Sequence, residues 1–116
     1  MAKPLSDSVV ARGFRAILAA AVVLASTAPP VLAVDAQVKI ANFTFDPPTL
    51  TVKAGTTVTW INADDIPHLV SEKDGKFRSS ALDTNDKFSQ TFSTAGTVEY
   101  FCAIHPHMTG KIVVTP

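Results

Sequence analysis

The most constraining feature of this sequence is an alternation of apolar and polar residues with a period of two, which recurs between Val38 and Val114. Successive side chains of a β-strand point to opposite faces, so this alternation is typical of strands with one buried face. The inward positions of the expected strands are Val38, Ile40, Leu50, Val52, Val58, Trp60, Phe88, Phe92, Val98, Tyr100, Cys102, Ile112 and Val114. We therefore expect strands, and no sizeable helix, in this region.

Turn-forming clusters separate these segments, at 47–48, 53–56, 64–65, 73–75 and 94–97. Proline, glycine and aspartate dominate such turns. Strands and turns at this spacing predict an all-β fold, an antiparallel sandwich or barrel of about seven to eight strands. The polar segment 72–86 is expected to be a loop with one irregular edge strand.

The first third of the chain has a different pattern. Lys3, Arg12 and Arg15 precede an apolar run at 16–25, and small residues end at Ala33. This pattern predicts a secretory signal peptide, residues 1–33, cleaved after Ala33. The alternative is an uncleaved anchor, but the run is shorter than the roughly twenty residues that span a bilayer. Because Arg12 and Arg15 are not adjacent, we expect Sec-type export to the periplasm rather than twin-arginine export.

The remaining residues, 34–116, are expected to form one monomeric domain without a membrane span. They carry seven Lys and Arg residues against nine Asp and Glu residues. No basic stripe is present that could neutralise phosphates, so nucleic acid is excluded as a partner.

Cys102 is the only cysteine of the chain. Exported proteins usually use cysteines in pairs, so a single one is a free thiol, half of an intermolecular disulfide or a metal ligand. In the expected strand at 97–103, Cys102 shares a face with Tyr100 and opposes Glu99, which places the thiol at the inner end of the core.

A short loop after this strand offers three metal donors, in the stretch Cys102-Ala103-Ile104-His105-Pro106-His107-Met108. A thiolate with imidazoles and a thioether selects copper over calcium, magnesium or manganese, although zinc accepts the same nitrogen and sulfur donors. One loop cannot easily surround a metal ion, so we expect His68 to supply a further donor from elsewhere. Pro67 and Pro106 restrict the backbone next to two of these histidines.

At these residues the sequence resembles the cupredoxins, and among them the amicyanins. The resemblance runs from about Val38 to Val114 and includes the Pro67-His68 pair and the segment from Tyr100 to Lys111. It implies a Greek-key fold and one type 1 copper ion that cycles between Cu(I) and Cu(II). It further implies Cys102, His68 and His105 as equatorial ligands, Met108 as the axial ligand, and an exposed His105 edge in an apolar patch.

Two positions depart from the family pattern. Leu69 and Ala103 stand where most cupredoxins carry polar residues that hydrogen-bond to each other and brace the two ligand loops. Losing both leaves no unpaired polar group. We expect a backbone N–H near Leu69 to donate to the Cys102 sulfur, and the loops to be less tightly tied. His107, beside an expected ligand, is expected to be a solvated loop histidine, with a docking or second-metal role as the alternative.

The resemblance implies a one-electron carrier between redox partner proteins, such as a dehydrogenase and a cytochrome. An alternative is an envelope protein that traffics or stores Cu(I), for which the apolar pair at Leu69 and Ala103 leaves room. We expect no enzymatic activity, because no acid–base pair or second metal cluster accompanies the site and so small a domain offers no deep pocket.

Overall fold

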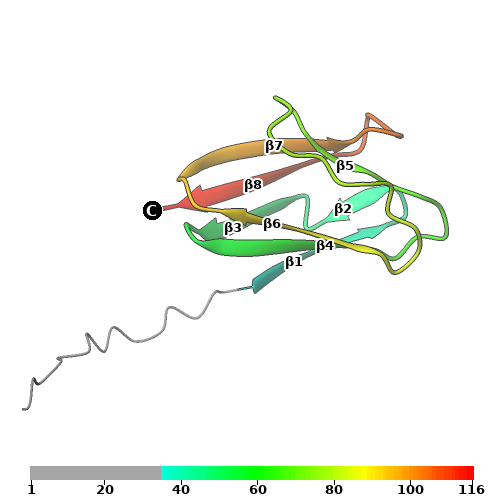
Figure 1. Ribbon diagram of the computed structural model, residues 1–116, viewed down its shortest axis with the longest axis horizontal. Coiled ribbons are helices and arrows are strands. Elements are labelled where there is room, and N and C mark those ends of the chain that lie inside the picture. Colours follow the sequence, from blue (N-terminus) through cyan, green and yellow to red (C-terminus); the bar gives the residue numbers. More distant parts are fainter. Residues whose placement is uncertain (1–34) are drawn as a thin grey trace, which may run out of the picture. The chain divides into compact units, whose positions relative to one another are not determined.

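The computed structural model describes residues 35–116, and this part of the chain contains eight strands and no helix. The strands are β1 (Asp35–Ala41), β2 (Thr44–Asp46), β3 (Thr49–Lys53), β4 (Thr56–Asn62), β5 (Val70–Glu72), β6 (Lys87–Phe92), β7 (Gly96–Cys102) and β8 (Thr109–Thr115). They form two sheets, in the orders β2-β1-β4-β6 and β3-β8-β7-β5 (Figure 1). The all-β sandwich expected from the sequence is confirmed.

Both sheets are mixed, so the expectation of a purely antiparallel sandwich is wrong. β1 runs parallel to β4, with Val38 opposite Trp60, and β3 runs parallel to β8, with Leu50 opposite Ile112. The reason lies at Pro47 and Pro48, where the chain leaves the β1–β2 hairpin and crosses to the other sheet. When β4 returns to the first sheet, it lies beside β1 in the same direction.

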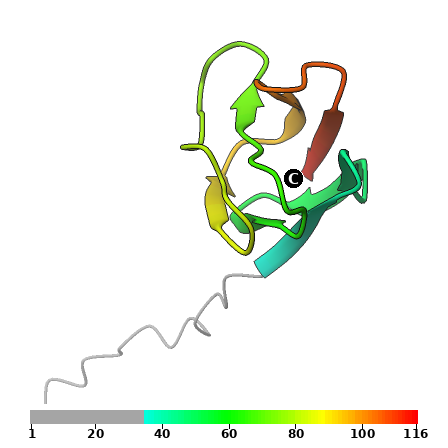
Figure 2. The ribbon, with the colours of Figure 1, turned by 90° about the vertical axis from the view of Figure 1, so that its right-hand side faces the viewer.

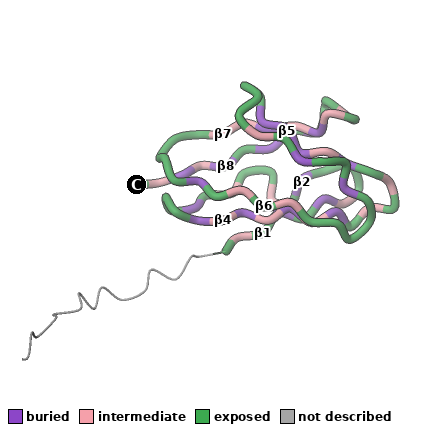
Figure 3. Tube along the Cα trace, in the orientation of Figure 1, coloured by how far each residue is buried: buried purple, intermediate pink, exposed green. Residues whose placement is uncertain are grey.

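The core lies between the two sheets and contains most of the side chains that the alternation placed inward, whereas Leu50, Phe88 and Val98 are only partly buried and pack against it. Val38, Ile40, Val58, Trp60 and Ile112 are fully buried. Figure 3 shows how buried positions alternate with exposed ones along the strands. Burial of these apolar side chains is the main stabilising contribution to the fold, and the Cys102 thiol belongs to the same core.

The segment after β5 folds back across one edge of the second sheet. Isolated bridges join Ser71 to Arg78 and His68 to Leu82, so the expected loop with an irregular edge strand is present, with its strand starting earlier, at Val70. Leu82 is buried and exchanges two backbone hydrogen bonds with His68, of 2.7 and 3.1 Å. This segment therefore fixes the backbone of His68.

The predicted signal peptide, residues 1–33, lies outside the described residues. Among residues 35–116, no helix is long and apolar enough to cross a membrane.

Candidate metal centre

The loop between β7 and β8 is closed by its own backbone hydrogen bonds. The Cys102 N–H donates to the Met108 carbonyl (3.0 Å), the His105 N–H to the Cys102 carbonyl (3.2 Å), and the Met108 N–H to the His105 carbonyl (2.9 Å). Figure 2 shows this loop, in orange, at one end of the sandwich. Because each of its donor-bearing residues is fixed by a backbone bond, the loop presents their side chains in a defined geometry.

His68 reaches the same place from the segment between β4 and β5. Its side chain is fully buried, and its Nδ1 atom lies 3.7 Å from the Cys102 Sγ atom. The His105 Nδ1 atom lies at the same distance from that sulfur. Donor atoms of all three residues fall within 4.8 Å of one another. The structure thus brings together three of the residues that the sequence predicted.

These spacings fit a single metal ion. Bonds of about 2.0 to 2.3 Å to nitrogen and sulfur place two donors of one tetrahedral ion roughly 3.6 Å apart. The two observed sulfur–nitrogen distances of 3.7 Å match this separation. One thiolate and two imidazoles are also the donor set that suits copper.

The Leu69 N–H donates to the Cys102 sulfur at 3.4 Å, as the sequence analysis predicted. A hydrogen bond to the thiolate stabilises its negative charge. The Ala103 N–H also donates to the Leu69 carbonyl, at 3.1 Å. The backbone therefore links the two ligand-bearing segments, although the side chains of Leu69 and Ala103 are apolar.

Met108 and His107 differ in burial. The Met108 side chain is almost completely buried and belongs to the core cluster that includes Cys102. His107 is exposed, as a solvated loop residue would be. The structure accordingly gives Met108, and not His107, an inward position at this loop.

Asp64 contacts the ring of His68 on the side away from the sulfur. Its Oδ2 atom accepts a hydrogen bond from His68 Nε2 at 2.8 Å, which leaves the Nδ1 lone pair free toward Cys102. Burial alone would raise the pKa of Asp64, but hydrogen bonds from the Phe43 and Asn42 N–H groups and from His68 hold that pKa below its ordinary value. The carboxylate is therefore ionised at neutral pH.

Asn62 anchors the segment that carries Asp64. Its side-chain amide donates to the carbonyls of Ile66 and Leu82, both at 2.8 Å, and its Oδ1 atom accepts from the Asp64 N–H at 2.9 Å. Asn62 is fully buried. The polar side chain at the end of β4 thus holds both segments that flank His68.

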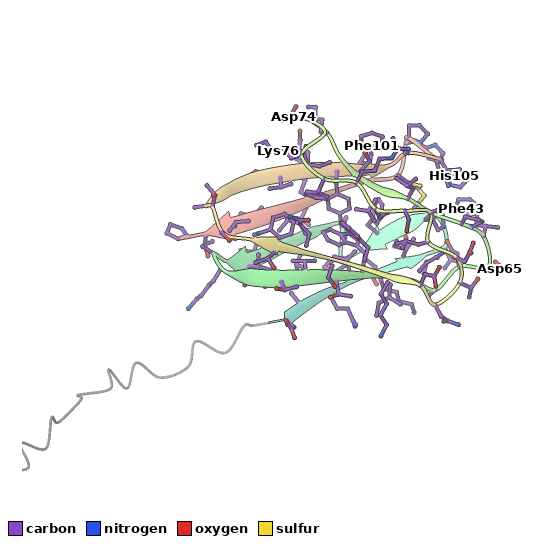
Figure 4. The ribbon with its side chains drawn as sticks, in the orientation of Figure 1. Phe43, Asp65, Asp74, Lys76, Phe101 and His105 are labelled. Atoms are coloured by element: carbon purple, nitrogen blue, oxygen red, sulfur yellow. The ribbon has the colours of Figure 1, made fainter. Side chains whose placement is uncertain are left out.

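Phe43 lies over the two histidines. Its ring centroid is 5.7 Å from that of His68 and 5.1 Å from that of His105, with near-perpendicular planes. Figure 4 shows Phe43 and His105 at the same end of the sandwich. Phe43 was not expected near the site from the sequence, and neither was the role of Asp64. Asp64 had one usable signal, its place four residues before a histidine predicted to bind metal, because metal-ligating histidines commonly bond a carboxylate through the second ring nitrogen.

Comparison with known proteins agrees with this geometry. Residues 32–115 match the family described as copper binding proteins, plastocyanin/azurin family. The chain is 40% identical over 83 residues to amicyanin-alpha of Methylorubrum extorquens, covering 67% of this chain and 70% of that protein. It is 43% identical over 82 residues to the amicyanin of Paracoccus denitrificans, covering 66% of this chain and 63% of that protein.

Among solved structures, a purple cupredoxin from Nitrosopumilus maritimus superposes with a TM-score of 0.65 at 35% identity, covering 70% of this chain and 100% of that chain. Together with the His–Cys–His donor set, these matches indicate one type 1 copper ion as the cofactor. The chain belongs to the plastocyanin/azurin family of copper-binding proteins, the cupredoxins.

Proposed function

We propose that this chain is an exported one-electron carrier in which His68, Cys102, His105 and Met108 hold the copper ion. When bound, the copper supplies the redox chemistry, by alternating between Cu(I) and Cu(II). The chain's own contribution is to fix the donors before the metal arrives. The amicyanins and the purple cupredoxin that this chain resembles support the carrier role.

The observation that carries the proposal is the buried, closed donor set. Cys102 and His68 are both 0% exposed, and each is held by backbone hydrogen bonds from a separate segment. A site that cannot relax between the geometries preferred by Cu(I) and Cu(II) keeps the cost of electron transfer small. His105, which is only half-buried, is the ligand through which electrons would enter and leave.

Visible and EPR spectroscopy of the copper-loaded protein tests the ligand assignment. We expect an intense thiolate-to-copper charge-transfer band and a narrow copper hyperfine splitting. Cys102→Ser should abolish both, and His68→Ala or His105→Ala should strongly alter both. His107→Ala is the matched control, because this exposed histidine lies in the same loop and its loss should leave both signals unchanged. A colourless oxidised protein with bound copper would contradict the assignment.

The alternative function is copper trafficking or storage, which the apolar side chains of Leu69 and Ala103 favour because they provide no bond between the ligand loops. The electron self-exchange rate and the rate of Cu(I) transfer to a competing chelator separate the two functions. A carrier exchanges electrons fast and loses almost no metal. Slow electron exchange with rapid metal transfer would support trafficking instead.

Export is proposed from the sequence pattern of residues 1–33. Expression of the full chain in a bacterium with a periplasm, followed by fractionation and mass spectrometry, tests it. We expect a periplasmic protein whose mass corresponds to residues 34–116. A full-length protein that remains in the membrane fraction would show that the N-terminal segment is an anchor.

A further inference from the structure

We propose that Asp64 is a positioning residue of the copper site, which ties His68 to the β1–β2 turn and thereby holds the Phe43 ring against both histidines. This inference rests on the proposed function, because it takes His68 and His105 as copper ligands. It gives Asp64 and Phe43 the role of orienting the histidine rings, which the hydrogen bonds within the ligand loop do not fix.

The Asp64 carboxylate is the meeting point of three donors. Its Oδ1 atom accepts from the Asn42 N–H at 2.7 Å, and its Oδ2 atom accepts from the Phe43 N–H at 3.1 Å and from His68 Nε2 at 2.8 Å. Only 13% of the side chain is exposed. Hydrogen bonds between a charged carboxylate and N–H donors are stronger than neutral ones, so this contact can hold two segments together.

The backbone of Asp64 is itself fixed on both sides. Its N–H donates to the Asn62 side chain at 2.9 Å, and its carbonyl accepts from the Thr84 hydroxyl at 2.7 Å. A residue whose backbone and side chain are both bonded cannot swing away from the imidazole without breaking several hydrogen bonds. Asp64 therefore holds the His68 ring in a fixed position, which a mobile surface carboxylate would not do.

The β1–β2 turn, whose N–H groups bond to Asp64, has an unfavourable backbone conformation. Asn42 and Phe43 have φ angles of 51° and 58°, in the left-handed region. Tight hairpin turns need this geometry at both central positions and usually place Asn, Asp or Gly there, whereas a bulky residue such as phenylalanine is rare. The two N–H bonds to Asp64 offset that cost, and they direct the Phe43 ring toward the histidines.

Phe43 lies on His68 and His105 and is nevertheless 47% exposed. The ring thus covers the imidazoles on one side and meets solvent on the other. Edge-to-face contacts between aromatic rings favour a defined mutual orientation. Phe43 belongs to the turn of the first sheet, whereas His105 belongs to the loop of the second sheet, so the contact joins the two sheets at the ligand end.

The hydrogen bonds that join Leu69 to Cys102 and Ala103 do not by themselves orient the histidine rings. The Leu69 N–H donates to the Cys102 side-chain sulfur and the Ala103 N–H to the Leu69 carbonyl, but neither bond reaches an imidazole ring. With apolar side chains at Leu69 and Ala103, the ring orientation of His68 depends on Asp64. The orientation of His105 is limited by Phe43 on its outer side.

Asp64→Ala is the main test, with Asp65→Ala, an exposed neighbouring carboxylate, as the matched control. In the copper-free wild type, ¹⁵N NMR should show the His68 ring protonated at Nε2 only. Asp64→Ala should give a mixture of tautomers and lower the copper affinity roughly 10- to 100-fold, as expected when the partner of a ligating histidine is removed. Asp65→Ala should change neither. A wild-type tautomer and wild-type affinity in Asp64→Ala would overturn the proposal.

Asp64→Asn removes the charge and keeps one acceptor oxygen, which can still accept from His68 Nε2 and the Phe43 N–H, although the amide NH₂ then faces the Asn42 N–H. We expect a reduction potential above that of wild type, since the lost negative charge no longer favours Cu(II), with the Nε2-protonated tautomer kept. An unchanged potential would show that the charge of Asp64 has no part in the site, whereas a tautomer mixture like that of Asp64→Ala would overturn the positioning role.

Phe43→Ala tests the aromatic contact and changes a side chain that is already half exposed. We expect faster copper loss to a chelator with an unchanged His68 tautomer, and a rate equal to wild type would refute the Phe43 part. The tautomer is read without copper. A colourless wild-type protein would therefore count against the ligand assignment, whereas an unaltered tautomer in Asp64→Ala counts against Asp64.

Discussion

Two regions of this sandwich differ in how their polar side-chain atoms are paired. One is the ligand end, around His68 and Cys102, and the other is the aromatic core, around Trp60 and Tyr100. At the ligand end, the side chain of Asn62 makes three hydrogen bonds of 2.8 to 2.9 Å, and Asp64 accepts three. In the core, the Trp60 indole N–H and the Tyr100 hydroxyl have no hydrogen-bond partner within the described residues. The polar atoms of Asn62 and Asp64 near the histidines are paired, whereas these two aromatic core atoms are not.

At the ligand end the fold must orient individual side-chain atoms, whereas in the aromatic core it has only to pack side chains against one another. Trp60 packs against Tyr100 with ring centroids 5.2 Å apart, and Phe45 packs on Tyr100 at 4.8 Å. Such ring packing excludes water but orients atoms loosely, whereas a hydrogen bond fixes distance and angle. The hydrogen bonds around His68 therefore supply the defined geometry that the donor atoms of a metal site need.

Asn62→Leu removes the polar anchor beside His68 at nearly constant volume. The Ile66 carbonyl and the Asp64 N–H would lose their partner, whereas the Leu82 carbonyl keeps the His68 N–H, and each unpaired group costs about 1 to 3 kcal/mol. We expect a loss of about 4 kcal/mol in the free energy of unfolding, measured by urea denaturation of the copper-free protein. A loss below about 1 kcal/mol would mean that the anchor is as dispensable as the unpaired core atoms.

The pH dependence of stability tests the buried Tyr100 hydroxyl of the aromatic core. Burial raises the pKa of Tyr100 to about 12. A group whose pKa is higher in the folded state stabilises the fold below its unfolded pKa, near 10, and loses that contribution as pH rises toward the folded value. Stability should therefore fall by about 2 kcal/mol between pH 10 and 12.

Tyr100→Phe is the control for this alkaline effect. Lysines also titrate in this range, so the informative quantity is the difference between wild type and Tyr100→Phe in urea denaturation at each pH. An equal loss of stability in both proteins would show that Tyr100 is not the group responsible.

Gly110→Ala tests how tightly the core is packed around the Tyr100 ring. A Cβ atom at Gly110 would overlap the phenol ring of Tyr100, which lies opposite it on β7. Overpacking of a tight core costs about 1 to 3 kcal/mol, so we expect a loss of about 2 kcal/mol by thermal or urea unfolding. In a Tyr100→Leu background the same change should cost much less. If the cost is equal in both backgrounds, the phenol ring is not what excludes the methyl group.

The sequence predicted these two regions unequally. Local alternation was enough to place Trp60, Tyr100 and Cys102 in the core, because side-chain direction along a strand depends only on parity. Strand direction was not predictable in the same way. The parallel pairing of β1 with β4 results from a crossover at Pro47 and Pro48, and alternation carries no information on it.

The same limit applies within the site. His105 and Met108 could be predicted because they share a short loop with Cys102, and His68 could be added because one loop cannot surround a metal ion. The bond from the Asn42 N–H to Asp64 joins residues 22 positions apart, and the left-handed conformation of Phe43 contradicts its ordinary preference. Both depend on how the turn meets the rest of the fold, so neither is written in local sequence pattern.

The smallest expected effect belongs to Tyr100→Phe at neutral pH. Its hydroxyl is buried without a partner, so removing the oxygen abolishes a desolvation cost and leaves no other group unpaired. We expect stability equal to wild type or higher by up to about 1 kcal/mol, measured by urea denaturation at pH 7. A clear destabilisation would show that the hydroxyl is hydrogen-bonded, for example to a buried water. In that case the aromatic core would use polar restraint just as the ligand end does, and the contrast between the two regions would be one of degree.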